Sequence, residues 1–318
     1  MPESAGYGFG WSEGWYRSWG DLPINYYIDP DGTADISGTS EFDAIRTSFN
    51  TWENLRFSGI DFTDMGTGIN VGTWQQDGYN VLFWLPTSDS SWYGGTAIWE
   101  INNHISETDT AFNDYWTWRI GAVSGCVDVQ SVATHEIGHW LAIEDLYDGS
   151  NTAQTMYYGT ALNNVSKQTL EWGDENGAHY VYPVHNDANS GGDGSNTFSG
   201  ATGGLLKGTL YYARLCDLPT PDHTLDIEDY YKIYAGSSDR LSFSLYPPSN
   251  ADFDLELYNP SGALVAYSRN RGNGAQELIL RDGMGTAGWW RMRIVRYSTG
   301  PQGGNGQYSF QYRNMPLL

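Results

Sequence analysis

Basic residues are scarce in this chain. Its 318 residues include 38 aspartates and glutamates but only 16 lysines and arginines, which leaves a formal net charge of −22 at pH 7. A protein that binds nucleic acid neutralises phosphates with clustered lysine and arginine. The composition therefore excludes nucleic-acid binding through a basic face, and it predicts repulsion from anionic membranes. A solvated acidic surface is the simplest interpretation of the charge.

Cysteine and long apolar runs are also in short supply. The two cysteines, Cys126 and Cys216, are too few for a disulfide framework, although they suffice for one bridge. No run of 18 apolar residues occurs, so we expect no membrane insertion. Residues 1–20 lack a basic segment followed by an apolar stretch, so we do not expect a signal peptide there.

Aromatic residues and glycine, in contrast, are abundant. Phenylalanine, tryptophan and tyrosine make up 15% of the chain, and 39 residues are glycine. So many large apolar side chains can fill a buried core, and the length favours two domains over one. A span rich in Gly, Ser and Asn at 184–203 has no hydrophobic period and is predicted to be a linker. We therefore expect an N-terminal segment at 1–20, a first domain at 21–183 and a second at 204–318.

The first domain mixes helix and strand patterns, which favours an α+β fold. Apolar residues recur at helical spacing after Ser40, which has the pattern of a capping box together with Asp43. Further helices are expected at about 128–141 and 174–182, and strands at 23–29, 80–86 and 94–101.

The second domain has a different period. From about residue 226 to residue 313, apolar and polar residues alternate in short runs. Turn residues separate these runs, as in Asn259-Pro260-Ser261-Gly262. Short strands at this spacing predict an all-β sandwich.

One motif points directly to chemistry. His135 and His139 lie four residues apart on the predicted helix, so they project from nearly the same face and can share one tetrahedral metal ion. Glu136 is rotated by about 100° from His135 and can reach a water molecule beside the metal. This is the H-E-x-x-H arrangement, in which the glutamate is the general base. The alternative is a pair of ordinary surface histidines on a helix.

A catalytic zinc site needs a third protein ligand. Asp145 follows His139 by six residues, and a continuing helix would carry it about 9 Å along the axis, out of reach. The chain must therefore turn back, and the turn falls at Ala142, where an alanine with positive φ costs about 1 kcal/mol or more. Asp145 is the favoured third ligand, and the neighbouring Glu144 is its rival.

Three stretches carry a family resemblance. HEIGHWLAIED at 135–145 resembles the metzincin pattern H-E-x-x-H-x-x-G-x-x-H/D, with Ala142 in place of glycine and the aspartate ligand of the snapalysin-like variant. TMYYG at 155–159 resembles the Met-turn beneath the zinc, with Met156 as its methionine. QTLEWGDENGAHYVYP at 168–183 is similar to the closing helix of matrixins. The resemblance covers roughly residues 19–183 and implies a metzincin-like catalytic domain with a twisted mixed sheet and an active-site helix.

The resemblance implies a secreted zinc-dependent endopeptidase that hydrolyses proteins or peptides, with Glu136 acting as general base on a zinc-bound water. The substrate is expected to extend along residues 95–99 by strand addition. Tyr158 matches the Met-x-Tyr pattern of astacins, where the tyrosine ligates zinc or stabilises the oxyanion, but it fits an ordinary packed tyrosine equally well. The implied zinc ligands are His135, His139 and Asp145.

Two alternatives remain open at the level of sequence. One is a non-catalytic extracellular binding protein on a zincin scaffold, which would have no need of Glu136. The other is a zincin with a distant glutamate ligand such as Glu171.

Residues 204–313 resemble a bacterial or archaeal pre-peptidase C-terminal domain, most clearly at 226–236, 251–262 and 306–313. Such domains accompany secreted peptidases, so this resemblance supports export. In an exported protein, a bridge between Cys126 and Cys216 would persist. The oligomeric state is not indicated. Acidic residues that offer oxygen ligands for Ca²⁺, or are simply solvated, are Asp226, Glu228, Asp229, Asp252 and Asp254.

Overall fold

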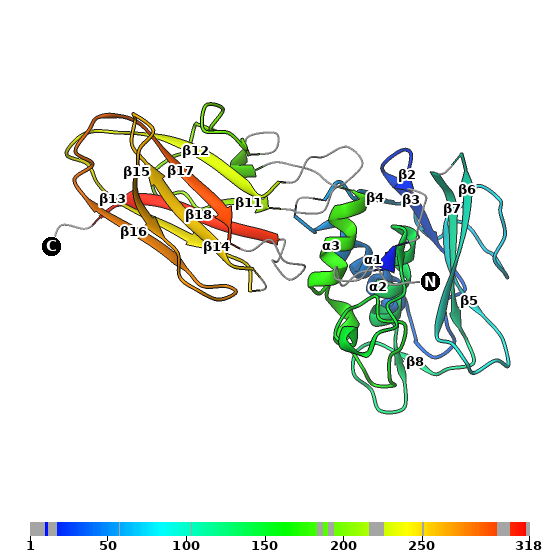
Figure 1. Cartoon of the computed structure of the whole chain (residues 1–318). Coiled ribbons are helices and arrows are strands. Elements are labelled where there is room, and N and C mark those ends of the chain that lie inside the picture. Colours follow the sequence, from blue (N-terminus) through cyan, green and yellow to red (C-terminus); the bar gives the residue numbers. More distant parts are fainter. Residues whose placement is uncertain are drawn as a thin grey trace. The chain divides into compact units, whose positions relative to one another are not determined.

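The computed structural model divides into two compact units, Met1–Pro183 and Val184–Leu318, and both are drawn in Figure 1. No helix in the described part of the chain is long and apolar enough to cross a membrane. The structure describes residues 10–11, 18–56, 58–102, 104–182, 187–189, 194–215, 226–249, 251–297 and 306–315.

The first unit is built on a mixed sheet of six strands. Five of them follow the order β2-β7-β5-β3-β4 with parallel neighbours, and β6 pairs antiparallel with β7. Within the described residues β6 has no second neighbour, so one side of this strand is open. The strands are β2 (Ser18–Trp19), β3 (Ile24–Ile28), β4 (Phe62–Asp64), β5 (Val81–Leu85), β6 (Gly94–Ile101) and β7 (His104–Asn113).

Three helices accompany this sheet: α1 (Ser40–Glu53), α2 (Val129–Trp140) and α3 (Trp172–Val181). The hydroxyl of Thr134 in α2 lies 3.0 Å from that of Ser48 in α1, and the indole N–H of Trp52 donates to the Thr134 carbonyl at 2.8 Å. Small residues at this crossing allow the two helices to approach closely. The apolar face expected for α1 is confirmed, since Phe42, Ile45, Phe49 and Trp52 are all buried.

Short elements complete the first unit. β1 (Gly10–Trp11) pairs antiparallel with β10 (Ile143–Glu144), and β8 (Trp118–Arg119) pairs parallel with β9 (Val127–Asp128). Two 3₁₀ turns follow, η1 (Gly149–Asn151) and η2 (Ser166–Gln168). They belong to the loop that leads from α2 to α3.

The second unit consists of two four-stranded antiparallel sheets, ordered β11-β18-β13-β16 and β12-β17-β14-β15. Buried residues of both sheets form one apolar cluster, for example Phe243 from the first and Trp290 from the second. The elements are η3 (Asp187–Asn189), β11 (Tyr211–Leu215), β12 (Glu228–Ala235), β13 (Arg240–Tyr246), β14 (Phe253–Tyr258), β15 (Leu264–Ser268), β16 (Glu277–Asp282), β17 (Gly288–Arg296) and β18 (Gly306–Asn314).

The predicted capping box at Ser40 is wrong. The N-cap of α1 is Thr39, which makes no side-chain capping bond. A capping box needs its second side chain at the third residue of the helix, and Asp43 is the fourth. A capping box forms instead at the start of α3, which begins two residues earlier than expected. There the Asp174 carboxylate accepts the backbone N–H of Glu171 at 2.8 Å.

The span 184–203, which we expected as a linker, contains residues that pack on the second unit. Ser195 bridges to Tyr230 and Thr202 to Tyr231, both in β12. A Cβ on Gly194 would lie 1.9 Å from Oδ1 of Asp229, so only glycine fits there. Small residues thus serve close packing in this span, although they leave no hydrophobic period.

Candidate metal centre

Helix α2 carries the two histidines of the H-E-x-x-H motif. Its N-terminus is capped by Asp128, whose carboxylate accepts the backbone N–H of Ser131 at 2.8 Å. Buried residues surround the helix on nearly all sides, which fixes its rotation relative to the sheet. His135 and His139 project from one face, with ring centroids 5.0 Å apart.

Hydrogen bonds determine which nitrogen of each imidazole is available. Nδ1 of His135 lies 2.7 Å from the Thr155 carbonyl, and Nδ1 of His139 lies 2.8 Å from the Ile143 carbonyl. A carbonyl oxygen can only accept, so each Nδ1 carries the hydrogen. In the neutral rings the lone pairs are therefore on Nε2, as a metal site requires.

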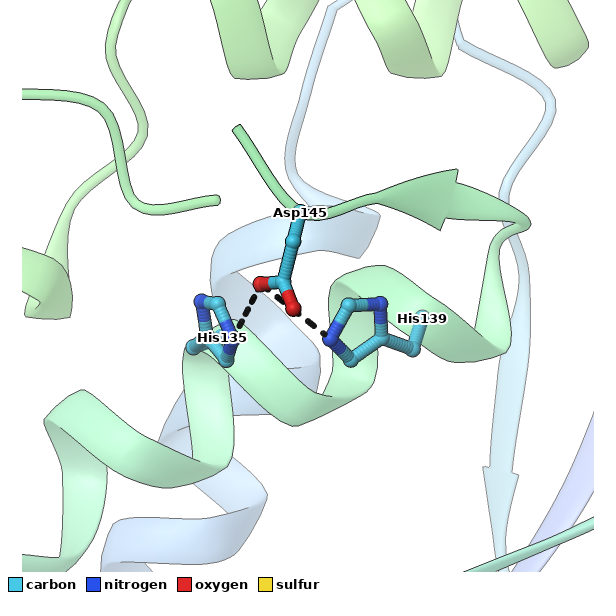
Figure 2. Close-up of side chains that lie close together, drawn as sticks. All are labelled: His135, His139 and Asp145. Atoms are coloured by element: carbon cyan, nitrogen blue, oxygen red, sulfur yellow. Dashed lines mark ion pairs between the residues drawn. The ribbon is translucent and has the colours of Figure 1, made fainter. Parts of the chain in front are cut away.

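Asp145 completes a group with the two histidines (Figure 2). Its Oδ1 lies 3.2 Å from Nε2 of His135 and 3.8 Å from Nε2 of His139. Ala142 makes the necessary turn, with φ of 62°. The backbone N–H groups of Leu141 and Ala142 close the helix by donating to the carbonyls of Gly138 and His139.

The donor set fits zinc. Two ligands of a tetrahedral zinc ion lie about 3.3 Å apart when each bond is near 2.0 Å. The separation of 3.2 Å between Asp145 and His135 matches this value, and that of 3.8 Å between Asp145 and His139 is about 0.5 Å longer. Oδ1 of Asp145 is buried and accepts no hydrogen bond in the described part of the chain. Buried oxygens are normally satisfied, so a cation at this point would supply the missing partner.

A chain of hydrogen bonds orients Glu136. The indole N–H of Trp140 donates to Oγ1 of Thr110, Oγ1 of Thr110 lies 2.8 Å from Oγ1 of Thr96, and Thr96 lies 2.8 Å from Oε2 of Glu136. An indole only donates and a carboxylate only accepts. The hydroxyl of Thr110 therefore points to Thr96, and that of Thr96 points to Glu136.

The same surroundings act on the pKa of Glu136. Burial raises this pKa, and the charge of His139 and the hydrogen bond from Thr96 oppose the rise. The carboxylate is only 4% exposed. A raised pKa makes the carboxylate a stronger base, as the acceptance of a proton from water requires.

A cleft of about 770 Å³ lies beside these residues. The Tyr158 side chain borders it and is 56% exposed, with its ring 5.2 Å from that of Tyr147. The Tyr147 hydroxyl, in contrast, lies 3.3 Å from Oδ2 of Asp145, one of the three grouped side chains. Further cleft residues are Trp92, Tyr93, Gly94, Gly95, Thr96, Ile98, Trp116, Val132, Glu144 and Lys167.

Met156 packs against helix α2. It is fully buried, and a Cβ on Gly138 would lie 2.2 Å from its sulfur atom. The carboxylate of Asp174 accepts the backbone N–H groups of Thr155 at 2.8 Å and Met156 at 2.9 Å, which holds this turn in place.

Other candidates from the sequence lie apart from this group. Glu144 borders the cleft, and Glu171 caps α3, but among the described residues neither joins the histidine pair within ligand distance. Cys126 is partly exposed and forms no disulfide within the described residues, and Cys216 lies outside them. The bridge between these cysteines stays a prediction.

The acidic residues suggested for calcium separate into different environments. Asp226 and Asp229 join Asp187 in a buried group of carboxylates whose oxygens lie within 4.8 Å of one another. Glu228 is paired instead with Arg293 at 2.5 Å. Asp254 lies 3.7 Å from the guanidinium group of Arg269, and Asp252 accepts the backbone N–H of Gly272 at 3.1 Å.

Three residues of the site were missed at the level of sequence. They are Thr96, Tyr147 and Lys167. Only Tyr147 had a local indication, since it follows the favoured third ligand by two residues. The other two come from strand β6 and turn η2, far from the motif along the chain.

Comparisons with known proteins place the first unit in a family. Residues 18–183, more than half of the chain, match the family model described as Matrixin. No curated protein matches the chain. Among solved structures, the pre-peptidase C-terminal domain of a Bacillus anthracis collagenase is 17% identical, with a TM-score of 0.26 over 35% of this chain and 90% of that one. The periplasmic inhibitor PliG of g-type lysozyme from Aeromonas hydrophila is 10% identical, with a TM-score of 0.27 over 36% of this chain and 95% of that one.

Neither structural likeness is strong enough to establish the fold of the second unit. The family match coincides with the mixed sheet, with α2 and with the group formed by His135, His139 and Asp145. The chain therefore belongs to the matrixin family of metallopeptidases.

Proposed function

We propose that this protein is a zinc-dependent endopeptidase in which His135, His139 and Asp145 hold the metal and Glu136 is the general base. The observation that carries the proposal is the convergence of two Nε2 lone pairs and one buried carboxylate oxygen beside an oriented glutamate. Bound zinc would supply Lewis acidity, which lowers the pKa of water and polarises a carbonyl group.

The protein's own side chains then carry the proton. Glu136 accepts it from the attacking water and returns it to the amine that leaves. Thr96 keeps Oε2 of Glu136 in place through the 2.8 Å hydrogen bond. The hydroxyl of Tyr158, which borders the same cleft, is proposed as a donor to the substrate carbonyl as negative charge develops on its oxygen. Met156 is proposed as the methionine of a Met-turn that supports the histidines from below.

The open edge of β6 is the proposed substrate track. Gly94, Gly95 and Thr96 border the cleft, and their strand lies next to α2. A Cβ on Gly94 would lie 2.7 Å from Oε1 of Glu136, so glycine allows the strand to approach the base this closely. An extended peptide added to this edge would pass the base with its backbone aligned by ladder hydrogen bonds.

We further propose that the protein acts outside the cell, with the second unit as a β-sandwich of the pre-peptidase C-terminal type. Its two antiparallel sheets around one apolar cluster support this assignment. Calcium binding by the second unit stays a prediction, which calorimetric titration of the chelator-treated protein with Ca²⁺ would test.

Glu136→Gln tests the function. The purified wild-type protein should contain about one zinc ion and lose peptide hydrolysis on treatment with a chelator. The variant should keep its zinc, because the ligands are intact, and lose several orders of magnitude in kcat, because the base is gone. A zinc-containing wild type that hydrolyses no peptide would favour a non-catalytic binding protein instead.

The choice of third ligand has its own test. Asp145→Ala leaves two histidines and should lose zinc on dialysis, whereas Glu144→Ala should retain it. Metal content by mass spectrometry decides between them. Zinc retained by Asp145→Ala and lost by Glu144→Ala would assign the third ligand to Glu144.

A further inference from the structure

Lys167 is a buried ammonium group beside the proposed metal centre. It lies in η2, borders the cleft and is only 4% exposed. Its Nζ contacts the carbonyl oxygen of Tyr157 and lies 3.3 Å from Nδ1 of His135. Among the described residues that border the cleft, it is the only lysine or arginine.

The hydrogen-bonding capacity of Lys167 is only partly used. An ammonium group has three N–H donors and no acceptor. Nδ1 of His135 carries a hydrogen that it donates to the Thr155 carbonyl, so it cannot accept from Lys167. In the described part of the chain, this leaves the carbonyl of Tyr157 as the one acceptor of Nζ.

The charge of Lys167 also lacks a direct partner. No carboxylate of the described residues lies within ion-pair distance, 4.0 Å, of its Nζ. The acidic groups that act on it electrostatically, Asp145, Asp174 and Glu136, lie beyond that distance. A buried charge without a paired counter-ion is costly.

The rest of the cleft suits a peptide side chain. Apolar walls come from Ile98, Val132 and the aromatic rings of Trp92 and Trp116. The other charged groups that border it, Glu136, Glu144 and Asp145, are acidic. Among the described residues that border the cleft, Lys167 is therefore the one lysine or arginine that could attract an entering carboxylate.

We propose that Lys167 makes this peptidase selective for peptides that place a carboxylate in the cleft beside His135. The carboxylate would pair with Nζ and use the donors that the protein leaves unfilled. It could come from the side chain of an aspartate or glutamate, or from the free C-terminus of a short peptide. This inference rests on the proposed peptidase function.

Matched peptides distinguish the two sources. One arm compares glutamate with glutamine at each position around the cleaved bond, with amidated C-termini throughout. The other arm compares neutral peptides with a free or an amidated C-terminus. With the full-length zinc-loaded protein, we expect one arm to show a preference of about tenfold or more in kcat/KM for the carboxylate, as is typical of a hydrogen-bonded charge.

Variants assign the preference to Lys167. Lys167→Met keeps the length of the side chain without charge, and it should reduce the ratio between acidic and neutral peptides to within about twofold. Lys167→Arg keeps the charge and should retain most of the preference. Lys207→Met removes a partly exposed lysine of the second unit and should keep the wild-type ratio. If Lys167→Met does not fold, the lack of a preference in both arms with the wild type still overturns the proposal.

Failure of this inference differs from failure of the proposed function. A wild type that cleaves peptides with no preference in either arm, or a preference that survives in Lys167→Met, overturns carboxylate selection alone. If no peptide is cleaved, the peptidase proposal fails. Calorimetric binding of the same peptides to Glu136→Gln then shows whether the glutamate peptide binds more tightly than its glutamine counterpart, and equal affinities overturn carboxylate selection as well.

Discussion

Thr96 and Glu136 are joined by a hydrogen bond of 2.8 Å between strand β6 and helix α2. The threonine is itself oriented by Thr110, which receives the indole N–H of Trp140. Glu136, the proposed base, is thus held through Thr96 and Thr110 by the side chain of Trp140, which lies one helical turn further along α2. This arrangement makes the orientation of Glu136 depend on the packing of β6 and β7 against α2.

Thr96→Val should lower kcat about tenfold or more and change KM little, because a hydrogen bond to a charged group contributes about 1.5–3 kcal/mol while the shape of β6 is kept. The acid limb of the pH–rate profile should move to higher pH, since the Thr96 hydrogen bond lowers the pKa of Glu136. Thr96→Ser keeps the hydroxyl and should behave like the wild type. Equal losses in both variants at unchanged zinc content would point to strand distortion instead.

Gly138→Ala should destabilise the first unit although alanine is favoured over glycine in helices. The propensity gain is about 1 kcal/mol, but the new Cβ would lie 2.2 Å from the sulfur of Met156 and 3.0 Å from the ring of Trp52. Overpacking of this kind costs about 1–3 kcal/mol. Urea denaturation measures the change, with Gly68→Ala as a control because a Cβ there meets no atom within 4 Å. A stabilised Gly138→Ala would mean that Met156 moves aside freely.

Ala142→Gly should leave stability within about 1 kcal/mol of the wild type, because relief of the positive φ is offset by the flexibility that glycine adds to the unfolded chain. Ala142→Val should destabilise by more than about 1 kcal/mol, since a β-branched residue at the φ of 62° is strongly disfavoured. Thermal unfolding of both variants checks this order. A Val variant as stable as the Gly variant would show that the turn is not strained.

Asp109 should make stability depend on pH. Burial raises its pKa to about 6, although its carboxylate accepts the backbone N–H groups of Gln75 and Val81. The folded state therefore holds this proton more tightly than the unfolded state. The contribution of Asp109 to the free energy of unfolding is fully present below about pH 4 and is lost as pH rises through about 6.

The measurement compares the free energy of unfolding of the wild type with that of Asp109→Asn. Between pH 4 and pH 7.5, the wild type should lose at most about 3 kcal/mol of its free energy of unfolding relative to Asp109→Asn. A difference that stays constant over this range would contradict the raised pKa.

Local patterns explain what could be read from the sequence. The period of an α-helix places His135 and His139 on one face, and the same argument shows that Asp145 is reached only through a turn at Ala142, which has the positive φ required. Alternation of apolar residues likewise predicted the strand-rich second part of the chain. In each case the information lies within about ten consecutive residues.

The remaining features depend on contacts between distant segments. Thr96 and Glu136 are 40 residues apart, and Lys167 and His135 are 32 apart. No periodicity links such positions, because the packing of β6 and η2 against α2 brings them together. The capping box predicted at Ser40 failed for a local reason. It depends on the exact start of the helix, and an error of one residue in the start of α1 is enough to remove it.

Asp145 is held from both sides by hydrogen bonds within the protein. On one side the Ile143 carbonyl accepts from His139, and on the other Leu146 exchanges backbone hydrogen bonds with Met156 at 2.8 Å and Tyr158 at 3.0 Å. Under the proposed function, the loop that bears Asp145 would therefore lose little conformational entropy on binding a metal. Zinc binding would then need no refolding of this loop, so the fraction of active molecules would follow the free zinc concentration as a simple binding equilibrium.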